Sequence, residues 1–248
     1  MLSKRISKML LSGAAVGLMA GAANASLNID IRATRVNGVA ISGAQTTKLI
    51  PVVANGDVIS FDIFAVVTGA NGFVTDDKIV SVSGSWRSSN GGLKGNILAD
   101  YVRTTFDSDG NATNGYDAPG ASVGLQQDLD SDGDLDLGSN NDSAAENFWA
   151  ARYQSTAGQN AGVPNGRRIG FGTFTVTNAT GQTIVNFDGR AAATAANYFQ
   201  DGVFVSEPSV DGAVGLTIGQ GGGGTVPEPA TLSLAGLAGL AMVRRRRA

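Results

Sequence analysis

Carboxylates are the side chains of this protein best placed to do chemistry, because its 248 residues include no His and no Cys. That composition excludes a Ser-His-Asp triad, an imidazole base and any metal site with His or Cys ligands. It also excludes disulfides and iron–sulfur clusters. The chemistry that remains open uses carboxylates, Lys, Arg, Tyr or a hard cation bound by oxygen ligands.

The carboxylates concentrate in one segment between Arg103 and Arg152, which contains no Lys or Arg. Ten acids lie in it, namely Asp107, Asp109, Asp117, Asp128, Asp130, Asp132, Asp134, Asp136, Asp142 and Glu146. Like charges at this density repel one another unless the segment is solvated, disordered or neutralised by a cation. Any testable biochemistry of the chain therefore lies in this segment.

Part of the segment has the order of a calcium loop. Carboxylates recur at every second residue, in Asp128, Asp130, Asp132, Asp134 and Asp136. Gly133 takes the sixth position and Leu135 the eighth, which is the spacing of an EF-hand-type loop. The spacing predicts a structural Ca²⁺ site, and the alternative is a solvated acidic loop.

The remaining ligands of this predicted site depart from the EF-hand pattern. Asp134 would supply its backbone carbonyl, and Asp136 would bind directly or through water. Ser139 stands where an EF-hand has a bidentate Glu, so Asp142 or Glu146 would have to close the site. The run resembles the helix-poor calcium loops of thrombospondin type 3 and dockerin-like repeats. Residues 107–111 repeat it less completely, as a second site or as a turn.

The N-terminal segment predicts a secretory signal. Lys4, Arg5 and Lys8 precede an apolar stretch over residues 9–23, and Ala23-Asn24-Ala25 supplies a small-x-small cleavage pattern. We expect the signal to occupy residues 1–25 and the mature chain to start at Ser26. The alternative is an uncleaved membrane anchor, for which the apolar run is shorter than the ~20 residues of a span.

The C-terminal segment has the opposite charge order. A Gly-rich linker over residues 221–225 leads to a Pro-Glu-Pro tripeptide, an apolar stretch over 230–243 and four Arg. The residues concerned are Pro227, Glu228, Pro229, Arg244, Arg245, Arg246 and Arg247. As a helix the stretch would measure about 21 Å, less than the ~30 Å hydrocarbon core. The Arg cluster would remain on the cytoplasmic side.

This order over residues 226–248 resembles the PEP-CTERM sorting signal of Gram-negative bacteria. The resemblance implies export and recognition by an exosortase in the inner membrane. It also implies cleavage near the tripeptide and transfer to the cell surface or extracellular matrix, after transient membrane retention of the tail. A plain single-span tail anchor is the alternative.

The body between these ends, residues 26–220, is far more acidic than the whole chain. Seven of the 18 Lys and Arg and one of the 21 acids lie in the two end segments. That leaves 11 bases against 20 acids, a formal charge of −9 where the whole chain has −3. Because phosphate contacts need basic patches, we expect no nucleic-acid partner.

The body has the pattern of a mainly β protein, a single antiparallel β-sandwich. Alternating apolar residues predict strands over residues 27–31, 58–67, 79–86, 169–176, 183–187, 203–206 and 214–218. Asn-Gly turns separate them, and residues 178–181 predict a hairpin. Residues 191–200 and 143–153 are the two candidates for a short helix.

Two pieces of the body resemble cohesin-like surface domains of bacteria. Residues 51–57 lead into a long alternating strand, and residues 169–176 are followed by a turn and a second strand over 183–187. The resemblance implies a jelly-roll or immunoglobulin-like sandwich. Residues of about 104–165 would form an Asp-rich insert in this domain.

These features favour a non-catalytic surface or matrix protein. A glycosidase would need paired carboxylates, and the body has only two Glu, Glu146 and Glu207, with its Asp residues clustered as for a metal. The alternative is a calcium-stabilised carbohydrate-binding module in which Trp149 and Tyr153 stack on sugar rings; otherwise Trp149 packs in the core. Expected partners are the exosortase and, beyond it, envelope components or exopolysaccharide.

Overall fold

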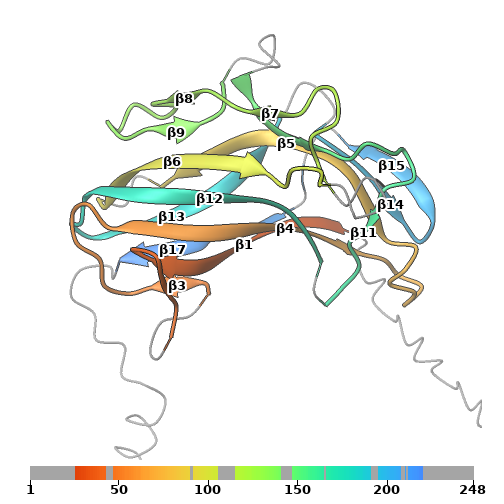
Figure 1. The fold of residues 1–248 in the computed structure, drawn as a ribbon, viewed down its shortest axis with the longest axis horizontal. Helices are drawn as coiled ribbons and strands as arrows, with labels where there is room; N and C mark the ends of the chain where they lie inside the picture. The colour runs from red at the N-terminus through yellow and green to blue at the C-terminus, as the bar shows by residue number, and fades with distance from the viewer. Residues whose placement is uncertain are drawn as a thin grey trace, which may run out of the picture.

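The computed structural model describes residues 26–42, 47–89, 92–105, 115–140, 147–164, 166–190, 195–207, 210 and 212–219. These residues form two β-sheets packed face to face (Figure 1), and none of them lies in an α-helix. In this described part no helix is long and apolar enough to cross a membrane. The predicted signal, linker and sorting tail, residues 107–111, Asp142 and Glu146 lie outside the described residues.

The first sheet has the order β16-β1-β4-β12-β6, and β2 pairs with β1. Its strands are β1 (Ser26–Val36), β2 (Val39–Ala40), β4 (Val58–Thr68), β6 (Lys94–Tyr101), β12 (Arg167–Asn178) and β16 (Gly212–Val214). Every second side chain of β4 is buried, as its alternating sequence predicts. This alternation places one apolar face of the sheet against the other sheet.

The second sheet is built around β5 (Lys78–Ser88) and has the order β15-β14-β5-β13-β17-β3. The other strands in this order are β3 (Leu49–Ile50), β13 (Gln182–Gly189), β14 (Ala196–Gln200), β15 (Val203–Glu207) and β17 (Leu216–Gly219). Short strands extend it beside β5, namely β7 (Ser122–Val123), β8 (Gln126–Gln127), β9 (Asp136–Leu137), β10 (Trp149–Arg152) and β11 (Gln159–Asn160).

The prediction of a mainly β fold is confirmed, with a correction to the pairing. The strands are mostly antiparallel, but β1 pairs with β16 and β17 pairs with β3 in parallel, so the sheets are mixed. Strand β6 was not predicted. Its apolar residues fall on both faces, since Leu98 is exposed while Ile97 and Ala99 are buried, and that hides the alternation.

The predicted hairpin over residues 178–181 is wrong. Strand β12 belongs to the first sheet and β13 to the second, so this turn carries the chain from one sheet to the other. A turn of this composition reverses the chain without fixing which strand becomes the neighbour. The shorter turn at Asn37 and Gly38 does close a hairpin between β1 and β2, with φ values of 51° and 78°.

Both candidate helices are corrected as well. Residues 196–200 form β14, and residues 149–152 form β10. Ala196 and Tyr198 are fully buried on one face of β14. Pairing with β5 and β15 buries these side chains at the period of a strand, and this packing overrides the weak helix preference of an Ala-rich segment.

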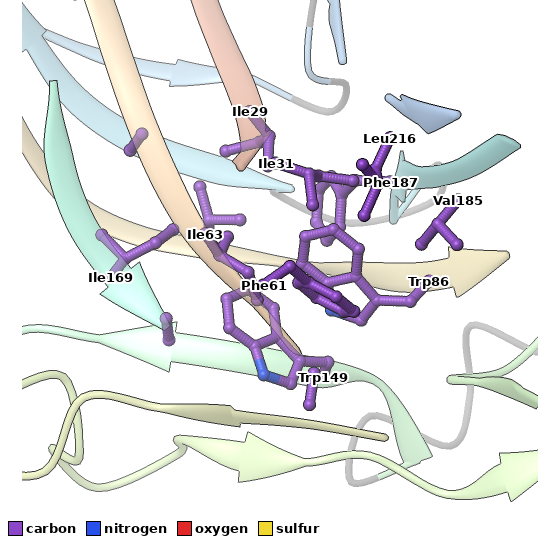
Figure 2. Close-up of a cluster of buried hydrophobic side chains, with 14 of the residues drawn as sticks. Ile29, Ile31, Phe61, Ile63, Trp86, Trp149, Ile169, Val185, Phe187 and Leu216 are labelled. Atoms are coloured by element: carbon purple, nitrogen blue, oxygen red, sulfur yellow. The ribbon is translucent and has the colours of Figure 1, made fainter. Parts of the chain in front are cut away.

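Aromatic side chains fill the centre of the core (Figure 2). The ring of Trp86 on β5 lies 5.3 Å from that of Trp149 on β10 and 4.7 Å from that of Phe187 on β13. Trp149 is fully buried and meets Trp86 edge-on. Tilted and edge-on pairs of this kind are favourable contacts beyond the burial of their area.

We expect Trp149→Ala to lower the free energy of unfolding by about 3–5 kcal/mol, because it removes the largest type of side chain from a packed site. Urea unfolding followed by circular dichroism measures the change. Phe73→Ala, at a ring that is 69% exposed, is the matched control and should change stability by no more than about 0.5 kcal/mol. Equal effects of the two substitutions would contradict the core role of Trp149.

Candidate metal centre

The Asp-rich run forms the connection between β8 and β9 and lies along one edge of the sandwich. Strand β9 pairs with β5 at Leu137 and Trp86, and the backbone N–H of Ile97 on β6 donates to the carbonyl of Leu135 at 2.8 Å. In Figure 1 this hairpin lies beyond β6 at the top of the view. The loop therefore covers the edge where β5 of one sheet comes close to β6 of the other.

The first half of the loop is organised by Asp128. Its carboxylate accepts hydrogen bonds from the backbone N–H groups of Ser131, Asp132 and Gly133, at 2.7, 3.2 and 3.1 Å. Ser131 and Gly133 have φ values of 64° and 94°, which Gly adopts without the strain that a side chain brings. This turn folds the run back on itself, so its alternate carboxylates converge.

Asp134 joins the two sheets through a single carboxylate. Its Oδ2 accepts from the Ser88 hydroxyl on β5 at 2.8 Å and from the Gly95 N–H on β6 at 3.0 Å. The side chain is only 1% exposed, and its other oxygen, Oδ1, is buried with no hydrogen-bond partner within the described residues. A buried carboxylate oxygen without a donor is costly.

Asp136 lies beside it and is fully buried. Its Oδ1 accepts from the backbone N–H of Ser88 at 3.0 Å, and its Oδ2 accepts from that of Leu129 at 3.3 Å. Asp130, Asp134 and Asp136 each place one carboxylate oxygen within 4.8 Å of the other two. We call these three residues the inner cluster.

A second group of three carboxylates overlaps with the inner cluster. Asp128, Asp130 and Asp132 also hold one oxygen each within 4.8 Å of one another, nearer to solvent. We call them the outer cluster, and Asp130 belongs to both. Lys94 offsets part of the charge, with its Nζ 3.9 Å from Asp132 Oδ2.

The charge gathered in the inner cluster opposes ionisation. Burial, with the neighbouring charges of Asp130 and Asp134, raises the pKa of Asp136 to about 7. Burial also raises the pKa of Asp134, and burial together with the charge of Asp132 raises that of Asp130. The site is thus a concentration of negative charge that either protons or a cation would neutralise.

The structure brings together five of the six predicted metal residues, in a different arrangement. Asp134 enters the inner cluster with its carboxylate, whereas the sequence pattern assigned its backbone carbonyl to the metal. Ser139 is bonded through its backbone to the hydroxyl of Ser85. Sequence reasoning missed Ser88 and Gly95, which lie 46 and 39 residues before Asp134 in the chain and carry no signal of their own.

The two aromatic residues considered for sugar stacking differ in their exposure. Trp149 is packed in the core against Trp86 and Phe187. Tyr153 is partly buried, with its ring 5.8 Å from that of Tyr116. The placement of Trp149 agrees with the core alternative and leaves neither face of its ring open to a sugar.

Comparison with protein families supplies the identity of the C-terminal segment. Residues 225–247 match the PEP-CTERM protein-sorting motif. The chain carries a PEP-CTERM sorting signal. The motif implies export, processing by an exosortase and an extracellular or cell-surface destination for the rest of the chain.

No curated protein matches the chain in sequence. Among solved structures, the C-terminal domain of the Streptococcus agalactiae AgI/II polypeptide BspA is 8% identical with a TM-score of 0.33, over 77% of this chain and 49% of that one. The type II cohesin dyad from the adaptor ScaA scaffoldin of Acetivibrio cellulolyticus is 12% identical with a TM-score of 0.31, over 77% and 48%. This chain spans about half the length of these structures.

The raised pKa of Asp136 predicts how the stability of the metal-free protein depends on pH. Its folded value of about 7 lies above the reference value of 3.8, so the folded state binds more protons between these two values. The free energy of unfolding should therefore rise as pH falls from 8 towards 5. Thermal unfolding in EDTA across this range measures the slope.

Asp136→Asn should flatten that slope, because the amide does not titrate. Asp62→Asn, which removes a carboxylate on β4 paired with Arg168 on the neighbouring strand β12, is the control and should leave the slope as in the parent. A parent protein whose stability falls steadily from pH 8 to pH 5 would contradict the charge balance described for the inner cluster.

Proposed function

We propose that this chain is a non-catalytic protein of the cell surface or extracellular matrix, with a Ca²⁺ ion that holds one edge of its sandwich. In this proposal residues 1–25 are a signal peptide, residues 26–220 form one domain, residues 221–225 are a linker, and residues 226–248 hold the chain transiently in the inner membrane until an exosortase processes it. The sorting motif at residues 225–247 supports the destination.

The observation that carries the calcium proposal is the inner cluster. Three carboxylates lie within 4.8 Å of one another, and the buried Asp134 Oδ1 has no hydrogen-bond partner in the described part of the chain. A cation at this point would give that oxygen a ligand bond and offset the mutual repulsion of Asp130, Asp134 and Asp136. These contacts are independent of the residue spacing that predicts a calcium loop.

The donor set favours Ca²⁺ among common cations. All side-chain donors are carboxylate oxygens, which suit hard cations, and Ca²⁺ accepts six to eight oxygens in an adaptable geometry. Mg²⁺ demands a near-ideal octahedron and retains its waters. Extracellular calcium modules work with dissociation constants of about 10⁻⁴–10⁻³ M, so a modest affinity would be sufficient at the proposed destination.

The proposed effect of the ion is structural. Asp134 contacts Ser88 on β5 and Gly95 on β6, while Asp136 contacts Ser88 again. Neutralising these carboxylates removes the repulsion that would otherwise push the loop off the edge. The ion would thereby fasten the β8–β9 hairpin to both sheets, and the surface it stabilises would be displayed outside the cell.

A non-catalytic role is supported by the chemistry of the side chains. The chain has no His or Cys, so a general base would have to be a carboxylate, Lys or Tyr. The described carboxylates with raised pKa values, Asp130, Asp134 and Asp136, lie together in the loop at the sandwich edge. Hydrogen bonds from backbone N–H groups and from the Ser88 hydroxyl hold Asp134 and Asp136 in fixed positions, as a structural ion site requires.

Calcium should stabilise the protein through Asp134. At about 10 mM Ca²⁺, a site of 10⁻⁴–10⁻³ M adds about 1.4–2.7 kcal/mol to the free energy of unfolding. Asp134→Asn should abolish this gain, because it removes a charged ligand while an amide oxygen still accepts from Ser88 or Gly95. In EDTA the variant should be at least as stable as the parent, since a buried charge is gone. Thermal unfolding with and without Ca²⁺ measures both effects.

The matched control is Asp188→Asn, at a carboxylate that is 58% exposed and outside both clusters; it should retain the full gain. Mg²⁺ at the same concentration should stabilise the parent less than Ca²⁺ does. No gain in the parent with Ca²⁺ would contradict the metal, and an unchanged gain in Asp134→Asn would contradict the site.

The sorting proposal is tested on the tripeptide. In a Gram-negative host with an exosortase, Pro227→Ala with Glu228→Gln and Pro229→Ala should block processing, so the full-length chain accumulates in the membrane fraction. The parent should appear at the surface with a shortened C-terminus, measured by intact mass. Gly222→Ala in the linker is the control and should be processed normally. A shortened C-terminus in the triple variant would contradict the role of the tripeptide.

A further inference from the structure

A polar pocket lies on the face of the second sheet that points away from the core. Its volume is about 290 Å³. It is lined mainly by Arg87, Ser139, Asn140, Phe148, Asp188 and Arg190. These residues come from β5, from the segments after β9 and before β10, and from the end of β13, so the fold assembles the pocket from distant parts of the sequence.

The polar groups of the pocket are held in place by one another. Arg87 Nε lies 3.1 Å from Asp188 Oδ2, and Arg87 Nη2 donates to Asn140 Oδ1 at 2.6 Å. The guanidinium of Arg190 lies over the ring of Phe148, 5.0 Å from its centroid. Asn140 Nδ2 donates to the carbonyl of Leu129 at 2.7 Å, which fixes the amide against the Asp-rich loop. The pocket is therefore largely preformed.

The charge of the pocket is opposite to that of the body around it. Two guanidinium groups and one carboxylate line it, whereas the body has 20 acids against 11 bases. Guanidinium groups bind carboxylates through paired N–H donors in a fixed planar geometry. Because Arg87 is paired with Asp188, Arg190 carries the net positive charge of the lining, which favours a carboxylate on the ligand.

The remaining groups suit hydroxyls. Asp188 can accept hydrogen bonds from them, and the Asn140 amide and Ser139 can bond to them as well. The volume is near the lower end of the range for small-molecule sites, about 300–1,000 Å³, which limits the ligand to about one sugar ring. A uronic acid carries a carboxylate and hydroxyls on one ring and is of this size.

We propose that this pocket binds a uronate unit of an acidic extracellular polysaccharide. The carboxylate of the sugar lies against Arg87 and Arg190, and its hydroxyls bond to Asp188 and Asn140. The site is separate from the core position of Trp149. It goes beyond the proposed function and does not require a metal in the loop.

The test compares methyl glucuronide with methyl glucoside, which has a hydroxymethyl group in place of the carboxylate, and with acetate, which lacks the sugar. Each is titrated into the ¹⁵N-labelled protein while the amide signals of Ser139, Asn140 and Gly189 are followed. The glucuronide should shift these signals in a saturable way and bind at least about tenfold more tightly than either comparison ligand. Titrations run with Ca²⁺ and with EDTA, so a failure of the metal proposal is seen separately.

Arg190→Gln should weaken glucuronide binding at least about tenfold. The matched control is Arg35→Gln, which removes a positive charge from an exposed site on β1 bonded to Gly38; it should bind as the parent does. Arg87→Lys, which retains the charge but loses the planar pair of donors, should also weaken binding. Melting temperatures confirm that the variants are folded.

Three results would overturn the proposal. Equal binding of acetate would show a carboxylate site without sugar recognition, and equal binding of the glucoside would show that the two Arg residues do not select the ligand. Unchanged glucuronide binding in both Arg190→Gln and Arg87→Lys would place the ligand elsewhere.

Discussion

The edge of the sandwich depends on the burial of a carboxylate between two sheets. Asp134 is almost fully buried, and one of its oxygens accepts from Ser88 on β5 and from Gly95 on β6. Buried charge is unfavourable unless donors or an opposite charge compensate for it. Hydrogen bonds compensate one oxygen, and the second has no hydrogen-bond partner within the described residues. The carboxylates of Asp130 and Asp136 lie close to that of Asp134. The position of the β8–β9 hairpin therefore depends on how this negative charge is neutralised.

The same constraint explains why the acids of the loop are arranged in two overlapping clusters. The carboxylate of Asp128 accepts hydrogen bonds from backbone N–H groups of its own turn. This turn brings the carboxylates at every second residue of the loop together. Asp134 and Asp136 then point to the strands behind the loop, where Ser88 bonds to both. The loop is thus folded by its own carboxylates and attached to the domain by them. A cation in the inner cluster would strengthen the attachment of the loop to the domain.

Sorting and folding are carried by separate parts of the chain. The last buried apolar side chains of the described sandwich, Leu216 and Ile218, precede the sorting motif at residues 225–247. Processing near residues 227–229 would leave every strand of the described domain in place. The pocket proposed to bind an acidic sugar lies within that domain, so processing of the tail would leave it intact as well.

The sequence by itself determined the sorting signal, the mainly β class, most strands and the segment that gathers the acids, because each is a local pattern of residue types. Tertiary structure decided which strands pair. The turn at residues 178–181 joins the two sheets, because each strand buries its own inner face and a turn does not choose its partner. Tertiary structure also decided that Trp149 lies in the core, because Trp86 contacts it only after folding. In the same way, the carboxylate of Asp134 contacts Ser88 and Gly95 only in the folded chain. Contacts between residues so far apart in the chain leave no spacing to recognise.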